Sequence, residues 1–299
     1  MEVNTTAPDA GIEEREDEQP EVWAEYVCKT LNFGAPHPGH LVEASVLSSI
    51  ELPPANYPVE ESLGKQILNK SLSRIQLEGI LYASQRFQYL LPDGSRAGFY
   101  LGDSAGVGKG RQISGIILDS LLRGRSRHCW LSVSADLHID ATRDLRDIGC
   151  LVEVVESIAK ITERKPIPTS AVVFSTYHGL ISRGNSKSSK TRMDELIEWL
   201  QEDRSQDFEG VIIFDEAHKA KNFREGDEHS TKIGDAVFKL QSVFPKARIV
   251  YSSATCVSHV DDLQYMTRLG YWGKGCLAPD FKKFSSNIIS AGVSGMEKS

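Results

Sequence analysis

Short apolar runs alternate along the chain with segments in which apolar residues recur every three or four positions. The short runs predict strands, which cover residues 98–101, 129–134, 150–155, 171–175, 211–214 and 247–252. The recurring pattern predicts helices over residues 71–91, 140–147, 193–201, 231–240 and 261–269, and another that carries Ile113, Ile116, Ile117, Leu121 and Leu122. Such alternation favours an α/β fold with a mostly parallel sheet and helices on both faces.

The flanks of this alternating region have a different composition. Residues 1–21 are rich in Glu and Asp with little to bury, so they are expected to form a disordered acidic tail. Residues 22–70 are expected to form an N-terminal arm with one short helix and an extended proline-rich stretch, because proline blocks continuous helix. Residues 160–168 and the basic stretch 183–192 read as loops.

The stretch Gly98–Arg111, GFYLGDSAGVGKGR, combines a strand, a loop of small residues, a lysine and the start of a helix. Glycine lets backbone N–H groups approach phosphate oxygens, and a helix N-terminus favours negative charge. Lys109 would then contact the β- and γ-phosphates of a nucleotide. The sequence departs from the usual P-loop pattern at two positions. Asp103 stands in place of the first glycine, and Gly110 stands in place of the Ser or Thr that contacts magnesium. An ordinary strand-to-helix turn is the alternative interpretation.

A second motif, Val211–His218, is an apolar run that ends in two carboxylates and a histidine. In open α/β sheets, ligands bind at the carboxyl ends of the strands, which is where these acids would lie. Asp215 is expected to hold Mg²⁺ and Glu216 to polarise the attacking water. Acidic residues also favour helix N-termini, so a solvated helix start is the alternative. The nucleotide interpretation requires Lys109 and the pair Asp215 and Glu216 to converge.

Composition narrows the class of protein further. The chain has 299 residues, is 40% hydrophobic and 25% charged, and carries a net charge of −7, as is typical of a soluble globular protein without a generally basic surface. No apolar run is long enough to cross a bilayer, so no membrane partner is expected. The five cysteines are scattered without a CxxC pair, which favours free thiols over a zinc site.

Three motifs in order, GDSAGVGKGR, IIFDEAHKAKN and YSSAT, resemble motifs I, II and III of superfamily-two helicase-like ATPases. The stretches AGFYLGDSAGVGKGRQISGII, VSADLHIDATRDLRDIG, FPKARIVYSSAT and MTRLGYWGKG are similar, more closely, to the Strawberry notch family. The resemblance runs from about Tyr26 to the C-terminus. It implies a RecA-like P-loop NTPase lobe over residues 71–299, and makes Gly110 a family feature.

The resemblance implies ATP and Mg²⁺ as cofactors. Lys109 and Glu216 would be catalytic, Asp215 would hold the metal, and Gln76 fits the adenine-reading glutamine, although a solvent-facing polar residue is the alternative. The residues expected to bind the nucleotide are Gln76, Gly106, Gly108, Lys109, Gly110, Arg111, Ser253 and Thr255. The family also implies a nuclear transcriptional co-regulator, with DNA or RNA, chromatin or transcription regulators as possible partners.

About 30 residues follow Gly270, too few for a second α/β lobe that would supply arginine fingers. The second lobe is therefore expected to be absent, with weak ATP binding and slow hydrolysis unless such a lobe is supplied. Magnesium affinity is expected to be low without a hydroxyl at position 110, and to be partly restored by Gly110→Thr. Two other functions stay open: a non-hydrolysing chromatin or protein interaction module, and a nucleic-acid-binding lobe with Ser134–Asp136 and Thr176–Tyr177 along a phosphate track.

Overall fold

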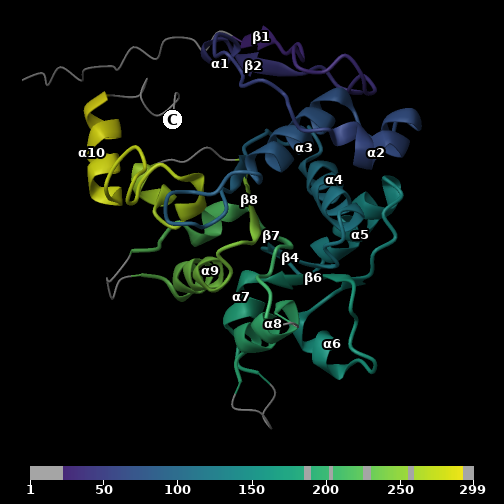
Figure 1. The fold of residues 1–299 in the computed structure, drawn as a ribbon, viewed down its shortest axis with the longest axis vertical. Coiled ribbons are helices and arrows are strands. Elements are labelled where there is room, and N and C mark those ends of the chain that lie inside the picture. Colours follow the sequence, from purple (N-terminus) through teal and green to yellow (C-terminus); the bar gives the residue numbers. More distant parts are fainter. Residues whose placement is uncertain (1–22, 185–189, 202–204, 225–229, 255–258, 292–299) are drawn as a thin grey trace, which may run out of the picture.

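Six parallel strands form the central sheet of the structure (Figure 1). The structure, a computed structural model, describes residues 23–184, 190–201, 205–224, 230–254 and 259–291. Across the sheet the strands follow the order β3 (Phe99–Leu101), β8 (Arg248–Ser252), β7 (Val211–Asp215), β4 (Arg127–Ser132), β6 (Ala171–Thr176) and β5 (Val154–Val155). The expected parallel α/β sheet is confirmed.

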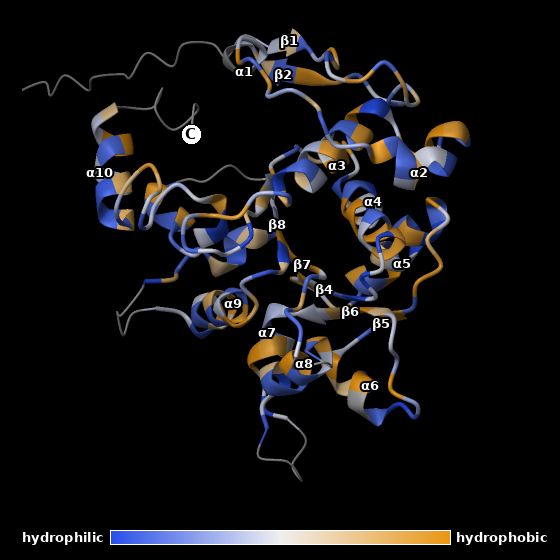
Figure 2. Ribbon diagram, viewed as in Figure 1, coloured by the Kyte–Doolittle hydropathy of each residue, from blue (hydrophilic) through white to orange (hydrophobic). Residues whose placement is uncertain are grey.

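Helices cover both faces of the sheet, and hydrophobic residues are found on helices on each side (Figure 2). Successive residues of a strand point to opposite faces, so Ile212 and Phe214 of β7 join one buried cluster while Val211 and Ile213 join the other. The first cluster contains α6 (Ile158–Glu163), α7 (Tyr177–Ile181), α8 (Arg192–Leu200) and α9 (Lys232–Val243). The second contains α2 (Val59–Leu68), α3 (Arg74–Arg86), α4 (Lys109–Leu122) and α5 (Leu137–Asp147).

The N-terminal arm is built differently from the expectation of one short helix and an extended stretch. Its first part is a small antiparallel ribbon of β1 (Trp23–Glu25) and β2 (Val42–Ala44), followed by the four-residue helix α1 (Ser45–Ser48). The arm then contributes helix α2, and Tyr57, Val59 and Leu63 are buried in the same cluster as α3 and α4. The last part of the arm therefore belongs to the core of the lobe.

Several expected elements differ in extent. The helix expected over residues 71–91 is α3, Arg74–Arg86, and the strand expected over residues 150–155 shrinks to Val154–Val155. Residues 261–269 form two short 3₁₀ turns, η2 (Val260–Leu263) and η3 (Thr267–Leu269), in place of one helix. Another 3₁₀ turn, η1 (Ala217–Ala220), follows β7, and the stretch read as a loop over residues 160–168 begins inside α6.

A separate aromatic cluster lies towards the C-terminus. Helix α10 (Phe281–Ala291), for which the sequence pattern gave no expectation, places Phe284 in parallel stacking on Tyr271, with ring centroids 5.5 Å apart. Trp272 and Phe281 complete this cluster. In Figure 1, α10 stands apart from the helices that cover the sheet.

Two further observations concern the described residues. No helix among them is long and apolar enough to span a membrane. Cys28, Cys129, Cys150 and Cys276 are free thiols, as expected, and Cys256 lies outside the described residues. The acidic tail expected over residues 1–21 and the central part of the basic stretch 183–192 also lie outside them, so those expectations stay predictions.

Candidate functional site

Residues 102–110 form an open loop of small residues between β3 and α4. Gly106 and Gly108 have φ values of +95° and +87°, in the left-handed region that glycine adopts at least cost. Within the described part of the chain, no backbone N–H group of residues 104–110 donates a hydrogen bond. The loop therefore presents a row of N–H groups at the N-terminus of a 14-residue helix, an arrangement that suits an anion.

Lys109 is the first residue of α4, and its side chain folds back over this loop. Its Nζ donates to the carbonyl oxygen of Asp103 at 2.7 Å and to that of Ser104 at 3.4 Å. The ammonium group thus lies over the same loop as the N–H groups. An ammonium has three protons to donate, so a bound anion could share Lys109 with these carbonyls or take it from them.

Gly110 lies against the side chain of Asp144 on α5. A Cβ atom at position 110 would lie 2.0 Å from Oδ2 of Asp144 and 3.1 Å from its Cγ. Burial raises the pKa of Asp144 above its ordinary value, and the nearby Arg143 and Arg111 partly oppose this effect. A carboxylate thus fills the space into which a Ser or Thr side chain at position 110 would extend.

Gln76 is buried, which contradicts the alternative that it lies on a solvent face. It connects α3 to the loop of residues 102–110. Its Oε1 accepts from the backbone N–H of Ser73 at 3.0 Å, and its Nε2 donates to the carbonyl oxygen of Val107 at 3.0 Å. Its Nε2 would lie 2.5 Å from a Cβ at position 108, so Gly108 is required by close approach as well as by its φ. Both ends of the amide therefore already have backbone partners.

Arg111 points away from the loop. Its Nη2 forms an ion pair with Asp147 at 2.7 Å, at the end of α5, and its Nη1 donates to the carbonyl oxygen of Ser71 at 3.4 Å. These contacts tie the first turn of α4 to its neighbours, and a direct contact with nucleotide would require Arg111 to give them up.

Asp215 is the last residue of β7, and the two neighbouring strands hold its carboxylate. Ser132 at the end of β4 donates to Oδ2 at 3.0 Å, and Ser252 at the end of β8 donates to Oδ1 at 3.1 Å. Tyr177 donates its hydroxyl to the backbone carbonyl of Asp215 at 2.8 Å. Burial and the nearby carboxylates raise the pKa of Tyr177 well above its ordinary value, so it remains a donor.

Glu216 has an unusual backbone conformation. It is one of two non-glycine residues with positive φ in the described part of the chain, at φ 49° and ψ 48°, a conformation that disfavours residues with a Cβ. Its Oε2 lies 3.3 Å from Nδ1 of His218, and the same nitrogen lies 3.2 Å from Oγ of Ser253. A strained, half-buried carboxylate at a strand end is the kind of outlier that accompanies functional sites.

Ser253 joins the acidic end of β7 to the strand before the loop. It is buried, and its backbone N–H donates to the carbonyl oxygen of Leu101 at 3.2 Å. Thr255, expected to bind nucleotide together with Ser253, lies outside the described residues.

Strand register brings the two motifs to one edge of the sheet. Leu101 of β3 is aligned with Ser252 of β8, and Ser252 is aligned with Asp215 of β7. Adjacent strands are about 4.8 Å apart, so the end of β3 and Asp215 are separated by about 10 Å across the sheet. A triphosphate with its metal ion is of this size, and the loop of residues 102–110 begins directly after Leu101.

The residues present fit a phosphate group and a hard cation side by side. The loop offers N–H donors and an ammonium, and the Asp215 carboxylate, already oriented by two hydroxyl groups, offers the oxygen ligand that Mg²⁺ prefers. The sequence places Ser252 at the end of an expected strand, but sequence reasoning missed Ser132 and Asp144. Ser132 could have been found in the same way, as a polar residue that ends an apolar run, whereas Asp144 gives no signal in the sequence.

Comparisons with known proteins identify the family to which the chain is similar. Residues 36–298 match a family described as P-loop containing NTP hydrolase pore-1. The chain is 45% identical over 287 residues to Protein strawberry notch of Drosophila melanogaster, covering 93% of this chain and 17% of that protein. It is 44% identical over 278 residues to human Protein strawberry notch homolog 2, covering 93% of this chain and 19% of that protein.

A plant relative and a solved structure complete the comparisons. Protein FORGETTER 1 of Arabidopsis thaliana is 39% identical over 297 residues, covering 96% of this chain and 22% of that protein. The chain therefore spans about a fifth of the length of these relatives. The SWI2/SNF2 ATPase core of Sulfolobus solfataricus in complex with dsDNA has a TM-score of 0.49 at 18% identity, covering 75% of this chain and 41% of that one.

Proposed function

The chain belongs to the Strawberry notch family and carries its P-loop NTP hydrolase domain, and on that premise we propose that it binds Mg-ATP at the shared edge of β3, β8 and β7. The observation that carries the proposal is the row of N–H groups at residues 104–110, aligned through β8 with the carboxylate of Asp215.

In this proposal each motif has a separate task. The N–H groups of residues 104–110 and the ammonium of Lys109 bind the phosphate oxygens. Asp215 holds Mg²⁺, with Ser132 and Ser252 fixing the orientation of its carboxylate. Magnesium, when bound, neutralises phosphate charge. Glu216 orients the attacking water, and His218 positions Glu216 and connects it to Ser253.

Gln76 positions the loop in this scheme, because its amide already bridges Ser73 and Val107. To read adenine as well, it would have to share or exchange one of these partners. Gly108 keeps the loop close to Gln76, since a side chain there would collide with the amide. Binding of adenine by Gln76, which the family resemblance implies, would therefore cost part of one of these two hydrogen bonds.

We propose slow hydrolysis by this chain alone. Phosphoryl transfer in related ATPases depends on arginine groups that a second lobe supplies, and such groups can raise the rate by about 10³-fold or more. Residues 23–291, as far as the structure describes them, form one six-stranded sheet with its covering helices and a two-stranded ribbon, and supply a single lobe. Turnover is therefore expected to rise when a second lobe is supplied.

Equilibrium binding of a fluorescent ATP analogue tests the proposal, with and without Mg²⁺. Lys109→Ala is expected to weaken binding about tenfold or more, since it removes a charge-assisted contact. Asp215→Asn is expected to remove most of the gain that Mg²⁺ gives. Matched controls are Lys282→Ala and Asp207→Asn, which change exposed residues elsewhere. Unchanged affinity in both site variants would contradict the proposal, and fast turnover by the chain alone would contradict the slow hydrolysis.

On the family resemblance alone, we also propose a nuclear role in regulating transcription, with chromatin proteins or nucleic acid as partners. Imaging the full-length protein with a fluorescent tag tests the location. Binding of DNA or RNA that weakens steeply with added salt would support the nucleic-acid function. Equal binding in low and high salt would argue against contacts to the phosphate backbone.

A further inference from the structure

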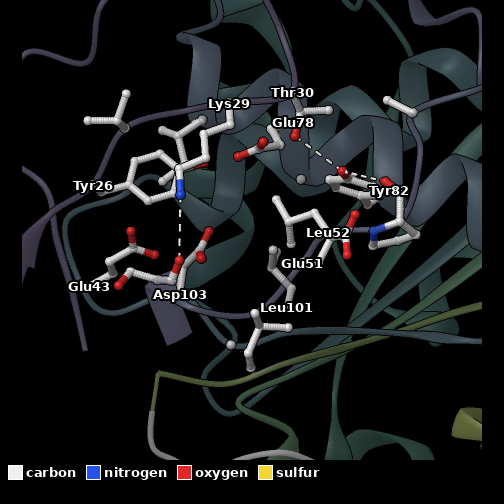
Figure 3. A pocket seen from close by; sticks show the side chains of 18 of the residues that line it. Tyr26, Lys29, Thr30, Glu43, Glu51, Leu52, Glu78, Tyr82, Leu101 and Asp103 are labelled. Carbon is white, nitrogen blue, oxygen red and sulfur yellow. Dashed lines mark hydrogen bonds between the residues drawn. The ribbon is translucent and has the colours of Figure 1, made fainter. Parts of the chain in front are cut away.

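A cavity of about 820 Å³ lies between the N-terminal arm and the lobe, on the open side of the edge strand β3 (Figure 3). The arm lines it with residues 26, 27, 29, 30, 43 and 48–55. The lobe lines it with residues of helix α3, the segment from Phe99 to Asp103, and Gln112 of α4. Lys109, Asp215 and residues 104–110 do not line this cavity, which adjoins the proposed nucleotide site at Gly102 and Asp103.

Acidic side chains from four separate segments surround this space (Figure 3). They are Glu43 on β2, Glu51 after α1, Glu78 on α3 and Asp103 at the start of the loop. Among the described residues none of these four takes part in an ion pair. Lys29 also lines the cavity, and its Nζ contacts the carbonyl oxygen of Ser48 at 3.5 Å. The cavity therefore carries four carboxyl groups and one ammonium group, that of Lys29.

Two buried polar groups at the cavity are incompletely satisfied. Glu78 is 7% exposed, and the hydrogen bond found for its carboxylate within the described residues comes from the thiol of Cys28 at 3.3 Å, a weak donor. Gln112 is fully buried, and its Oε1 has no partner in the described part of the chain. Burying polar groups without partners is costly, so a bound group that donates hydrogen bonds would stabilise this region.

Aromatic rings complete the lining and connect the two sides. Tyr26, Tyr82, Phe99 and Tyr100 line the cavity. Tyr82 donates its hydroxyl to the carbonyl oxygen of Pro53 at 2.9 Å and lies 3.1 Å from the hydroxyl of Thr30, which holds the arm against α3. Aromatic faces attract cations, most strongly where water is excluded.

We propose that this cavity binds an arginine side chain presented by a basic peptide of a partner protein. The guanidinium group offers five N–H donors in a plane, which matches dispersed carboxylates and aromatic faces better than a compact cation does. A metal ion fits poorly, because no three His, Cys, Asp or Glu side chains of the described residues lie close enough to share one. A phosphate group would be repelled by the four carboxylates. The volume also accommodates the residues that flank the arginine.

The charge state of Glu78 gives the site a pH dependence. Burial raises the pKa of Glu78 to about 7, and the charge of Asp103 adds to the effect. Between pH 6 and pH 8 Glu78 loses its proton while arginine stays charged, so peptide affinity is expected to rise by about three- to tenfold. The other charged and titratable groups around the cavity are Tyr26, Cys28, Lys29, Glu43, Glu51, Tyr82, Tyr100 and Asp103. Glu78→Gln is expected to flatten the profile.

Fluorescence anisotropy tests the proposal with the full chain and the labelled peptide Gly-Arg-Gly-Arg-Gly. A peptide with citrulline in place of arginine has the same shape without the charge. The double variant Glu43→Gln/Glu51→Gln is expected to weaken binding of the arginine peptide about tenfold. The matched control Glu60→Gln/Glu163→Gln removes two exposed carboxylates elsewhere and is expected to change affinity less than twofold.

Two outcomes would overturn the proposal. One is equal affinity for the arginine and citrulline peptides. The other is an effect of Glu43→Gln/Glu51→Gln on the ATP analogue but not on the peptide, which would assign the cavity to the nucleotide. The proposal does not depend on ATP binding, and Lys109→Ala separates the two: it is expected to lose the nucleotide and to keep the peptide.

Discussion

Gly110 shows how one residue depends on a distant neighbour. The sequence expectation was that Gly110→Thr would partly restore magnesium affinity. In the structure a Cβ at position 110 would meet Oδ2 of Asp144 at 2.0 Å, so the threonine side chain fits only if that carboxylate moves. We expect Gly110→Thr alone to destabilise the lobe by about 1–2 kcal/mol through overpacking. Thermal unfolding of purified protein measures this.

Asp144→Ala provides the matched background for that experiment. With the carboxylate removed, Gly110→Thr is expected to cost little, and the added hydroxyl can then approach a metal at the end of β7. A cost equal in both backgrounds would show that the collision with Asp144 is not the cause. Double-mutant cycles isolate this pairwise effect, since the two residues are in direct contact.

At the residue scale, the sequence predicted those features that depend on neighbouring residues in the chain, such as the conformation of the glycine-rich loop. The positive φ of Gly106 and Gly108 follows from a tight loop that must expose N–H groups, and the motif carries that information. The contact of Asp144 with Gly110 could not be predicted, because it depends on how α5 packs beside α4. The burial of Gln76 was missed for the same reason.

At the scale of elements, the ends of three neighbouring strands act together. Ser132 and Ser252 each donate to Asp215, so we expect Ser132→Ala and Ser252→Ala to weaken Mg²⁺-dependent binding of the ATP analogue about tenfold each. Ser175→Ala is the control, since Ser175 is the next-to-last residue of β6, the strand beyond β4, and its hydroxyl contacts the carbonyl oxygen of Thr176. Isothermal titration calorimetry with and without Mg²⁺ measures the affinity of each variant for the ATP analogue. An equal loss of affinity in all three variants would contradict the prediction.

Strand positions were predicted well because buried parallel strands are continuous apolar runs. The sequence did not predict correctly the elements whose conformation depends on tertiary contacts. Residues 261–269 have helical spacing, yet they form two 3₁₀ turns around Tyr265, whose hydroxyl donates to the carbonyl oxygen of Ala217 at 2.6 Å. Arg268 is buried and donates to the carbonyl oxygens of Gln241 and Phe244, so its contacts fix the following turn. Such contacts override local helix propensity.

At the scale of the whole molecule, the sequence predicted the class of fold but not the part that the arm plays in it. Prolines indicate where a helix is interrupted. They do not indicate which part of the lobe the intervening residues pack against. In the structure the arm has two roles. Its first part covers the acidic cavity, and its last part completes the core over α3 and α4.

The second role predicts how truncation affects folding. Tyr57, Val59 and Leu63 are at most 8% exposed, and burying three such side chains contributes about 5–9 kcal/mol by area, as an upper estimate. Tyr57 and Ser62 also donate to the buried carboxylate of Asp119, at 2.7 and 2.5 Å. Because total stability is about 5–15 kcal/mol, a chain of residues 71–299 is expected to lose cooperative unfolding, whereas residues 54–299 keep it at a lower midpoint.

Circular dichroism during heating measures both truncations against the full chain. Tyr57→Phe in the full chain serves as the mild comparison, since it keeps the ring and loses one hydrogen bond to a carboxylate, worth about 1.5–3 kcal/mol. If residues 71–299 unfolded cooperatively within a few degrees of the full chain, the segment from Tyr57 to Leu68 would be a dispensable cover. The lobe would then begin at α3, and the buried carboxylate of Asp119 would have to be stabilised by Ser84 and Arg123 alone.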